Sequence, residues 1–246
     1  GNYQNWGPIL WTQYTLSKEV MKLTALLAPL GDNYDKEASL EIKKGNSWVK
    51  ISKAAIDAFA ATATFRIEKW DDTQDTPYRV AYKFEEELVY YNGTIRKDPK
   101  GDHTLKVAGF TGNMDYVFPN IPIIEKLERI NPDMLFFSGD QIYEQVGGFG
   151  VMRNGFSMKQ STLNYLRKYY LFGWAFGDLM RDRPTVILPD DHDVFVGNVW
   201  GHNGRPIPKG KKFSYGGYLM SAQWVNMVQR TQTAHMPDPI DPEPID

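Results

Sequence analysis

Two short apolar runs in the second half of the chain each end in a group of acidic residues. The first run, Met134 to Phe137, continues into Ser138-Gly139-Asp140-Gln141-Ile142-Tyr143-Glu144, and the second, Thr185 to Leu188, continues into Pro189-Asp190-Asp191-His192-Asp193. Neither run alternates between apolar and polar residues, which is typical of strands in a mainly parallel sheet covered by helices on both faces. Ligands of such sheets collect beyond the carboxyl ends of the strands. The sequence therefore predicts that both acidic segments border one site.

Helical patterns separate these strands. We expect Asn120 to cap a helix that stops at Asn131-Pro132, and a second helix to run from about Ser161 to Met180. The first helix places four apolar residues on one face: Ile123, Ile124, Leu127 and Ile130. A strand at Thr104 to Phe110 precedes them, and a helical pattern at Tyr218 to Gln229 leads into a proline-rich tail that should be extended or disordered. Because three strands are few for a sheet covered on both faces, we expect the chain to be a fragment of a longer protein.

The first half of the chain follows a different pattern, with apolar residues at every second position. Tyr78, Val80, Tyr82 and Phe84 alternate with Arg79, Ala81 and Lys83, as in a half-buried strand. Similar runs occur at Val20 to Leu27, Leu40 to Lys43, Trp48 to Ile51, Ala63 to Trp70 and Glu87 to Tyr91. The turn-rich segments between these runs predict an antiparallel β-sandwich. Ile56 to Ala63 could instead form a short helical turn, because it is rich in alanine.

The segment from Lys97 to Gly101 reads as a linker between the two patterns. We therefore expect a two-domain α+β protein. Residues 1–100 would form the antiparallel β-sandwich, and residues 101–246 would form the first part of an α/β domain that ends in the proline-rich segment.

Charge and composition exclude several functions. The 246 residues include 28 basic and 30 acidic side chains, and a formal net charge of -2 gives no general attraction to nucleic acid or to anionic membranes. No apolar run approaches the roughly 20 residues of a membrane-spanning helix, and no signal peptide is visible after Gly1. Since cysteine is absent, disulfides and thiolate ligands are excluded, and any metal must be bound by oxygen or imidazole.

The first acidic segment offers two candidate metal ligands. Asp140 follows a buried strand and a glycine, so its carboxylate would project at the edge of the sheet, with Tyr143 about one helical turn later on the same side. A carboxylate can bridge two cations, and a phenolate is a hard ligand suited to ferric iron. In the alternative, Asp140 caps a following helix and Tyr143 packs in the core.

The second acidic segment places three carboxylates around one histidine: Asp190, Asp191, His192 and Asp193. Mutual repulsion makes such a group costly unless a cation is bound. An imidazole there could contact a phosphate oxygen or protonate a leaving group. In the alternative, the segment is a solvated acidic turn. Asn198, seven residues beyond Asp191, is a further oxygen donor.

Other polar features are weaker candidates. His103, His202 and His235 lie in segments rich in glycine or proline and are expected at the surface. Gly147-Gly148-Phe149-Gly150 lacks the ending of a phosphate-binding loop and is expected to be a flexible loop at the rim. A short basic run could attract an anionic substrate or be an ordinary solvated loop: Arg205, Lys209, Lys211 and Lys212.

The two acidic segments, Phe137 to Glu144 and Leu188 to Asp193, resemble the paired motifs of the alkaline phosphatase D (PhoD-like) metallophosphatase family. The resemblance covers about Leu105 to Asp238, and the strand-rich half is similar to the immunoglobulin-like domain that precedes the catalytic domain in many members. It implies hydrolysis of phosphomonoesters or phosphodiesters by a metal-activated water, at a site with iron and calcium or another metal pair. It also implies an extracytoplasmic location and a phosphate-ester substrate, with no sequence-specific nucleic-acid binding.

By this resemblance, Asp140 is the bridging ligand and Tyr143 the iron ligand, while Asp191 and Asn198 belong to the second metal. His192 matches the histidine near the substrate phosphate. The sequence departs from the family at Thr111-Gly112-Asn113, because relatives with the iron site carry a cysteine there and Gly112 has no ligating side chain. The later acidic and histidine motifs of the family have no counterpart before Asp246, so we expect this chain alone to be inactive and the full-length form to be the enzyme.

Two other functions fit the sequence. A non-enzymatic surface or ligand-binding protein would use aromatic residues of the strand-rich half: Trp48, Trp70, Tyr90 and Tyr91. An inactive metallophosphatase relative would keep the fold and lose one metal through Gly112. The sequence leaves the oligomeric state and the particular ester open.

Overall fold

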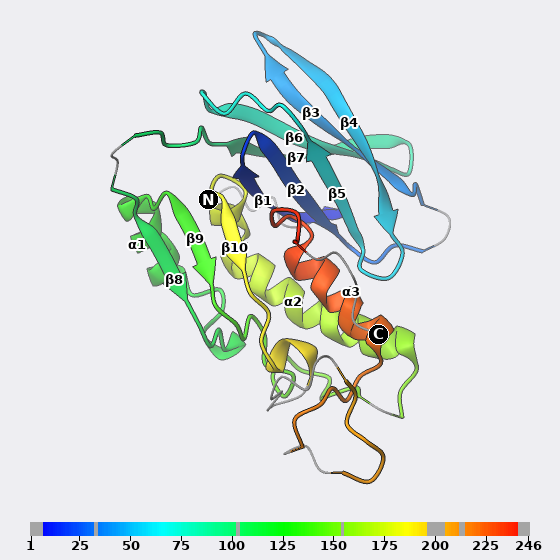
Figure 1. Ribbon diagram of the computed structural model, residues 1–246. Coiled ribbons are helices and arrows are strands. Elements are labelled where there is room, and N and C mark those ends of the chain that lie inside the picture. Colours follow the sequence, from blue (N-terminus) through cyan, green and yellow to red (C-terminus); the bar gives the residue numbers. More distant parts are fainter. Residues whose placement is uncertain are drawn as a thin grey trace.

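The computed structural model describes residues 7–31, 34–101, 104–153, 155–195, 205–211 and 215–240. Across these ranges the chain has an α+β fold, with a seven-stranded antiparallel sheet, a three-stranded parallel sheet and α-helices (Figure 1). The predicted change from antiparallel strands to strands alternating with helices is confirmed. It falls near residue 100, where the chain leaves the large sheet, although a division into two domains stays a prediction.

The large sheet comprises β1 (Ile9–Ser17), β2 (Val20–Leu27), β3 (Glu37–Lys44), β4 (Ser47–Asp57), β5 (Thr62–Ile67), β6 (Thr76–Phe84) and β7 (Glu87–Ile95). Their order is β1-β2-β5-β4-β3-β6-β7, and β4 pairs with β3 along most of its length and with β5 at its end. The sheet folds over on itself, so that Thr12 Oγ1 of β1 lies 2.6 Å from Tyr78 Oη of β6.

Two features of this half differ from the sequence expectations. The helical turn suggested for Ile56 to Ala63 is limited to a single turn, in which the amide of Ala61 donates to the carbonyl of Asp57 at 2.8 Å, because β4 continues to Asp57 and Ala63 of β5 pairs with Ile56. Strand β1 was not predicted. Its residues between Trp11 and Thr15 are all buried, polar ones included, because β1 is covered by the rest of the fold, so its sequence shows no polar face.

The small sheet comprises β8 (Val107–Phe110), β9 (Met134–Phe137) and β10 (Thr185–Ile187), in the order β10-β9-β8 with all pairs parallel.

The helices are α1 (Ile121–Ile130), α2 (Met158–Met180) and α3 (Ala222–Thr233), and 3-10 turns occur at Asp115–Val117 and His192–Val194. The predicted strands and helices are present, with ends shifted by a few residues. For example, α2 begins earlier than expected, because Ser157 and Gln160 form a capping box.

Helix α1 departs from prediction in two respects. Asn120 occupies the N-cap position in a left-handed conformation, with φ 54°, and its side chain makes no capping hydrogen bond. None of the helix residues is fully buried, and Ile123 and Ile130 of the predicted inward face are 43% and 44% exposed. The face is therefore only partly covered by the described residues.

Helix α2 joins the two sheets. In Figure 1 it runs between them. The rings of its Phe172 and Phe176 pack edge-on against the ring of Phe137 of β9. On its other side, the ring of Trp11 from β1 packs so closely on Gly173 that a Cβ atom there would overlap it. Because buried apolar residues of both sheets and of α2 belong to one connected core, the two halves of the chain pack as a unit.

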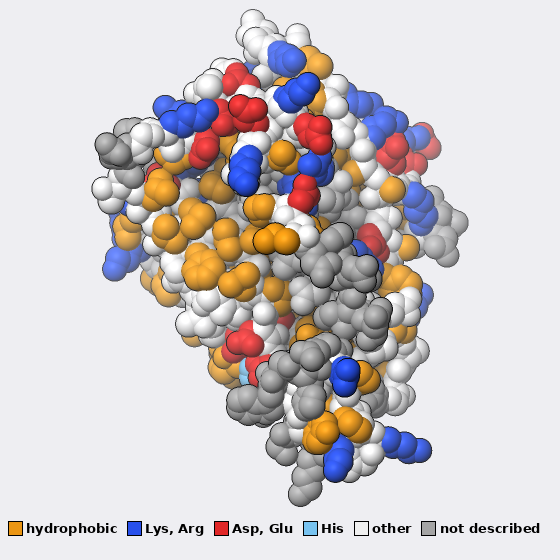
Figure 2. All heavy atoms as spheres, viewed as in Figure 1, with side chains coloured by type: hydrophobic (Ala, Val, Ile, Leu, Met, Phe, Trp, Pro, Cys, Tyr) orange, Lys and Arg blue, Asp and Glu red, His pale blue; other side chains and the backbone are white. Residues whose placement is uncertain are grey.

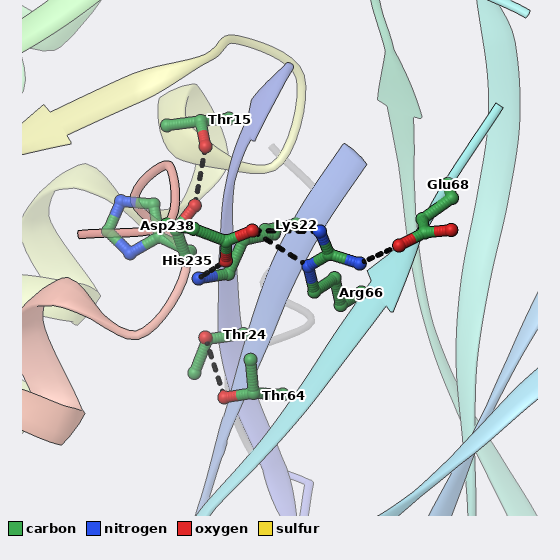
Figure 3. Close-up of polar contacts among 8 residues, drawn as sticks. All are labelled: Thr15, Lys22, Thr24, Thr64, Arg66, Glu68, His235 and Asp238. Atoms are coloured by element: carbon green, nitrogen blue, oxygen red, sulfur yellow. Dashed lines mark hydrogen bonds and ion pairs between the residues drawn. The ribbon is translucent and has the colours of Figure 1, made fainter. Parts of the chain in front are cut away.

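The segment after α3 returns to the large sheet (Figure 3). Asp238 pairs with Lys22 of β2 at 3.1 Å and with Arg66 of β5 at 2.8 Å, and the carbonyl of His235 accepts a hydrogen bond from Thr15. Asp238 therefore ties the start of the proline-rich tail to the sheet, while the described tail residues, 237–240, are exposed and form neither helix nor strand. Among the described helices, none is long and apolar enough to cross a membrane.

Candidate metal centre

The carboxyl ends of the three parallel strands meet at one edge of the small sheet. Phe110 pairs with Phe137, and Phe137 pairs with Ile187, so the segments that follow these strands start side by side. Ligand atoms of Asp140, Asp191 and His192 lie within 4.8 Å of one another there. The structure thus brings together three of the predicted site residues from two separate segments of the chain.

Backbone conformation after β9 directs Asp140 into this cluster. Gly139 has φ 107° and Asp140 has φ 54°, so the chain turns sharply at the end of the strand. The carbonyl of Asp140 accepts a hydrogen bond of 2.8 Å from the amide of Asn113, which follows β8. No helix begins at Asp140, so the helix-cap alternative for this residue is wrong.

The Asp140 carboxylate has an unused acceptor. Its Oδ1 is buried and has no hydrogen-bond partner among the described residues. Burial raises the pKa of this carboxyl above its usual value, although a hydrogen bond from Tyr143 opposes the shift. A buried carboxylate oxygen without a partner is costly, and a bound cation would offset that cost.

Tyr143 faces the cluster instead of packing in the core. Its hydroxyl bonds the Asp140 carboxylate, and burial together with the Asp140 charge raises the pKa of the phenol to about 12. Its ring lies 4.5 Å from that of His192, centroid to centroid. A Cβ atom on Gly112 would lie 3.3 Å from Tyr143 Oη, so position 112 borders this site.

The second acidic segment divides into an inward and an outward part. Asp193 is fully buried and accepts hydrogen bonds from the amides of Gln141 and Asp190, at 3.0 and 2.9 Å, and from Gln232 of α3 at 3.0 Å. Burial raises the pKa of Asp193 to about 7. Both interpretations from sequence need correction. The segment does not place all three carboxylates around one histidine, and it is not a turn that is solvated throughout. The buried Asp193 instead bonds residues that follow β9 and β10 and a residue of α3.

His192 is held by a carboxylate whose role the sequence did not reveal. Its Nδ1 lies 2.6 Å from Glu144 Oε2, and the other Glu144 oxygen pairs with Arg153. Burial lowers the pKa of the imidazole, but the hydrogen bond and charge of Glu144 raise it by more, so the net shift is upward. Glu144 stood in the first acidic motif, whereas no sequence pattern marked Arg153.

The remaining sequence candidates are not among the residues that the structure brings together at the site. Asn198, His103 and His202 lie outside the described residues. His235 is fully buried, contrary to expectation, and its Nε2 donates to the carbonyl of Thr185 at 2.8 Å. Figure 2 shows a histidine beside acidic side chains at the surface, and of the two described histidines only His192 is accessible.

The glycine-rich loop after Glu144 is anchored to α2. Lys168, itself buried, donates to the carbonyls of Val146 and Gly148, and the guanidinium of Arg167 lies 4.6 Å from the ring centroid of Phe149. These contacts hold the loop on α2, and its place at the rim of the site stays a prediction.

The aromatic residues suggested for a binding surface on the large sheet separate into two groups. Trp70 and Tyr91 are buried in the core. Trp48 and Tyr90 flank Arg79, whose guanidinium lies 4.6 and 3.9 Å from their ring centroids. Their exposed faces are therefore partly occupied by a side chain of the same sheet.

Comparisons with known proteins do not assign a family: neither a family model nor a curated protein matches the sequence. The chemistry available at the site follows from its donors, which are two carboxylates, one phenol and one imidazole. Oxygen and imidazole donors suit hard or borderline cations, including calcium, manganese, zinc and iron. The cluster formed by Asp140, Asp191 and His192 could thus hold a metal ion.

Proposed function

We propose that the protein is a metal-dependent phosphoesterase of the alkaline phosphatase D type, which in its full-length form hydrolyses phosphomonoesters or phosphodiesters. The proposal is carried by one observation: Asp140, Asp191 and His192 converge at the carboxyl ends of parallel strands, with a buried Asp140 oxygen that has no partner among the described residues. The resemblance of both acidic motifs to that family supports the same conclusion.

Each residue has a role in this proposal. Asp140 and Tyr143 would hold one cation, and Asp191 and Asn198 would hold a second, with the Asp140 carboxylate shared between the two. Bound cations would offset charge on the phosphoryl oxygens and lower the pKa of a bound water. His192 uses Nδ1 to bond Glu144, so its Nε2 is the nitrogen left to contact a phosphate oxygen or the leaving group.

Position 112 bears on which metals are bound. Because it is glycine and borders Tyr143, the site offers oxygen and imidazole donors without sulfur. We propose iron and calcium, or another pair of cations that accept such donors. An immunoglobulin-like character for the large sheet and an extracytoplasmic location complete the proposal.

Activity and metal binding of the full-length protein test this function. After metal loading, we expect turnover of p-nitrophenyl phosphate or bis(p-nitrophenyl) phosphate that a chelator abolishes. Asp140→Asn and Asp191→Asn should each lower metal affinity by more than about 10-fold and remove the turnover. Asp238→Asn, which alters a carboxylate that pairs with Lys22 and Arg66 on the large sheet, is the matched control and should retain both.

Two outcomes would contradict the proposal in different ways. If no metal-dependent turnover occurs and both variants bind metal like the parent, the cluster is not a metal centre. If metal binds to the parent with the expected dependence on Asp140 but neither ester is hydrolysed, the protein is an inactive relative that keeps the site.

A further inference from the structure

A buried carboxylate lies directly behind the candidate site. The side chain of Glu144 is 1% exposed, and its two oxygens have different partners: Oε2 lies 2.6 Å from His192 Nδ1, and Oε1 pairs with Arg153. Removing a carboxylate from water is costly unless an opposite charge and hydrogen bonds compensate. Arg153 supplies the charge, so Glu144 can stay ionised beside the imidazole.

The direction of the hydrogen bond follows from chemistry. An ionised carboxylate only accepts hydrogen bonds, so Nδ1 of His192 must carry the proton in its bond with Glu144. In a neutral imidazole the other nitrogen, Nε2, then carries the lone pair. The ring of Tyr143, 4.5 Å away, packs on the imidazole and limits its rotation.

Arg153 is itself held by the loop that connects it to Glu144. Two residues of α2 bind this loop: Lys168 donates to Val146 and Gly148 carbonyls, and Asn164 donates to the carbonyl of Gly150 at 3.3 Å. The amide of Met152 donates back to Asn164 at 3.4 Å. These hydrogen bonds fix the loop to α2 just before Arg153. They therefore restrict the position from which the guanidinium pairs with Glu144.

We propose that Glu144, paired with Arg153, is a positioning residue that fixes the orientation and the tautomer of His192, so that Nε2 faces the substrate. This inference rests on the proposed function for its catalytic meaning, because only a phosphoesterase would use that nitrogen on a phosphate ester. The tautomer itself is a property of the protein alone. It can be measured without metal, substrate or turnover.

Nitrogen-15 NMR of the metal-free, histidine-labelled protein tests the tautomer. At a pH where the imidazole is neutral, we expect the His192 signals, assigned by their loss in His192→Gln, to show a protonated Nδ1 and an unprotonated Nε2. In Glu144→Ala the ratio should invert, since an imidazole without such a partner favours the proton on Nε2. Gln145→Ala removes the exposed neighbouring side chain and should leave the parent ratio unchanged.

The parent measurement alone can overturn the inference, even if Glu144→Ala does not fold. A parent His192 with its proton on Nε2 would contradict it, and so would an unchanged tautomer in a folded Glu144→Ala protein. In the active full-length enzyme, the imidazole must first take up a second proton, on Nε2, before this nitrogen can donate one to the leaving group. Glu144→Ala misplaces this nitrogen and should lower kcat by at least about 10-fold with little change in KM. Turnover together with a proton on Nε2 would contradict this inference and leave the proposed function intact. The expected tautomer without turnover would support the positioning role of Glu144 and contradict the proposed function.

Discussion

A Cβ atom added to Gly139 would lie 2.7 Å from the Cβ of Asp190. The two acidic segments of the site therefore touch through a glycine, which also has φ 107°. This contact explains why the strand end before Asp140 carries a residue without a side chain, because any larger residue would push the Asp190 turn away from the sheet.

The first prediction concerns this contact. Gly139→Ala should lower the free energy of unfolding by about 2–5 kcal/mol, which combines roughly 1–2 kcal/mol for the left-handed conformation and roughly 1–3 kcal/mol for overpacking. Gly155→Ala is the matched control, since Gly155 has φ 101° and, apart from its chain neighbours, no atom of the described residues lies within 4 Å of the added Cβ. It should show only the first part of the loss in urea unfolding. Equal losses in the two variants would show that the contact with Asp190 is unimportant.

The second prediction concerns pH and metal affinity. Because burial raises the pKa of Asp140, its carboxyl holds a proton at higher pH than an ordinary aspartate. A proton and a cation compete for the same oxygens, so metal affinity should fall as pH falls through this raised pKa. Calorimetric titrations at a series of pH values should show the fall in the parent. A pH-independent affinity would indicate that Asp140 is not a ligand.

The third prediction uses His235. Burial lowers the pKa of its imidazole from 6.5 to about 4, with a further lowering by the charge of Lys22, although the hydrogen bond from Nε2 to the carbonyl of Thr185 opposes the shift. The folded state therefore binds fewer protons than the unfolded state between these values, and stability is lost as pH falls from 6.5 through 4. The loss should approach about 3 kcal/mol.

His235→Gln is the matching variant, because an amide can keep the bond to Thr185 without titrating. Unfolding by urea at pH 7 and pH 4 should show a smaller difference for the variant than for the parent. Identical pH dependence in both proteins would mean that His235 is accessible to protons in the folded state.

The fourth prediction concerns the contact between Trp11 and Gly173. Alanine is normally preferred over glycine inside a helix by about 1 kcal/mol, yet Gly173→Ala should destabilise the protein because its Cβ would overlap the Trp11 ring. In a Trp11→Leu background, which leaves room for a methyl group, the same substitution should become stabilising. A double-mutant cycle of unfolding free energies measures this change of sign, and additive effects would contradict the contact.

The sequence indicated which strand ends form the site, since two uninterrupted apolar runs followed by acidic residues define parallel strands and their carboxyl ends. The sequence could not show that Asp193 is buried while Asp191 faces the candidate site. In a tight turn, nearby side chains point in different directions without a regular period. The pairing of Arg153 with Glu144 was not predictable either, because an irregular loop, which has no sequence period, brings these two residues together.

Other differences have a similar cause. Polar residues in β1 and the histidine at position 235 look exposed by composition, but both are buried because hydrogen bonds from distant segments satisfy them. Gln13 donates to the carbonyl of Thr231, for example, and His235 donates to that of Thr185. Local sequence does not show such partners, so the burial of His235 and of the polar residues in β1 could not be predicted from it.

The close packing of Trp11 on Gly173 and Gly177 limits how the molecule can move. An enzyme whose halves rotate about a hinge needs an interface that can slide, whereas here an indole ring is seated against the backbone of α2. The two sheets should therefore keep a fixed angle to each other, and under the proposed function a substrate would reach the candidate site without their moving apart.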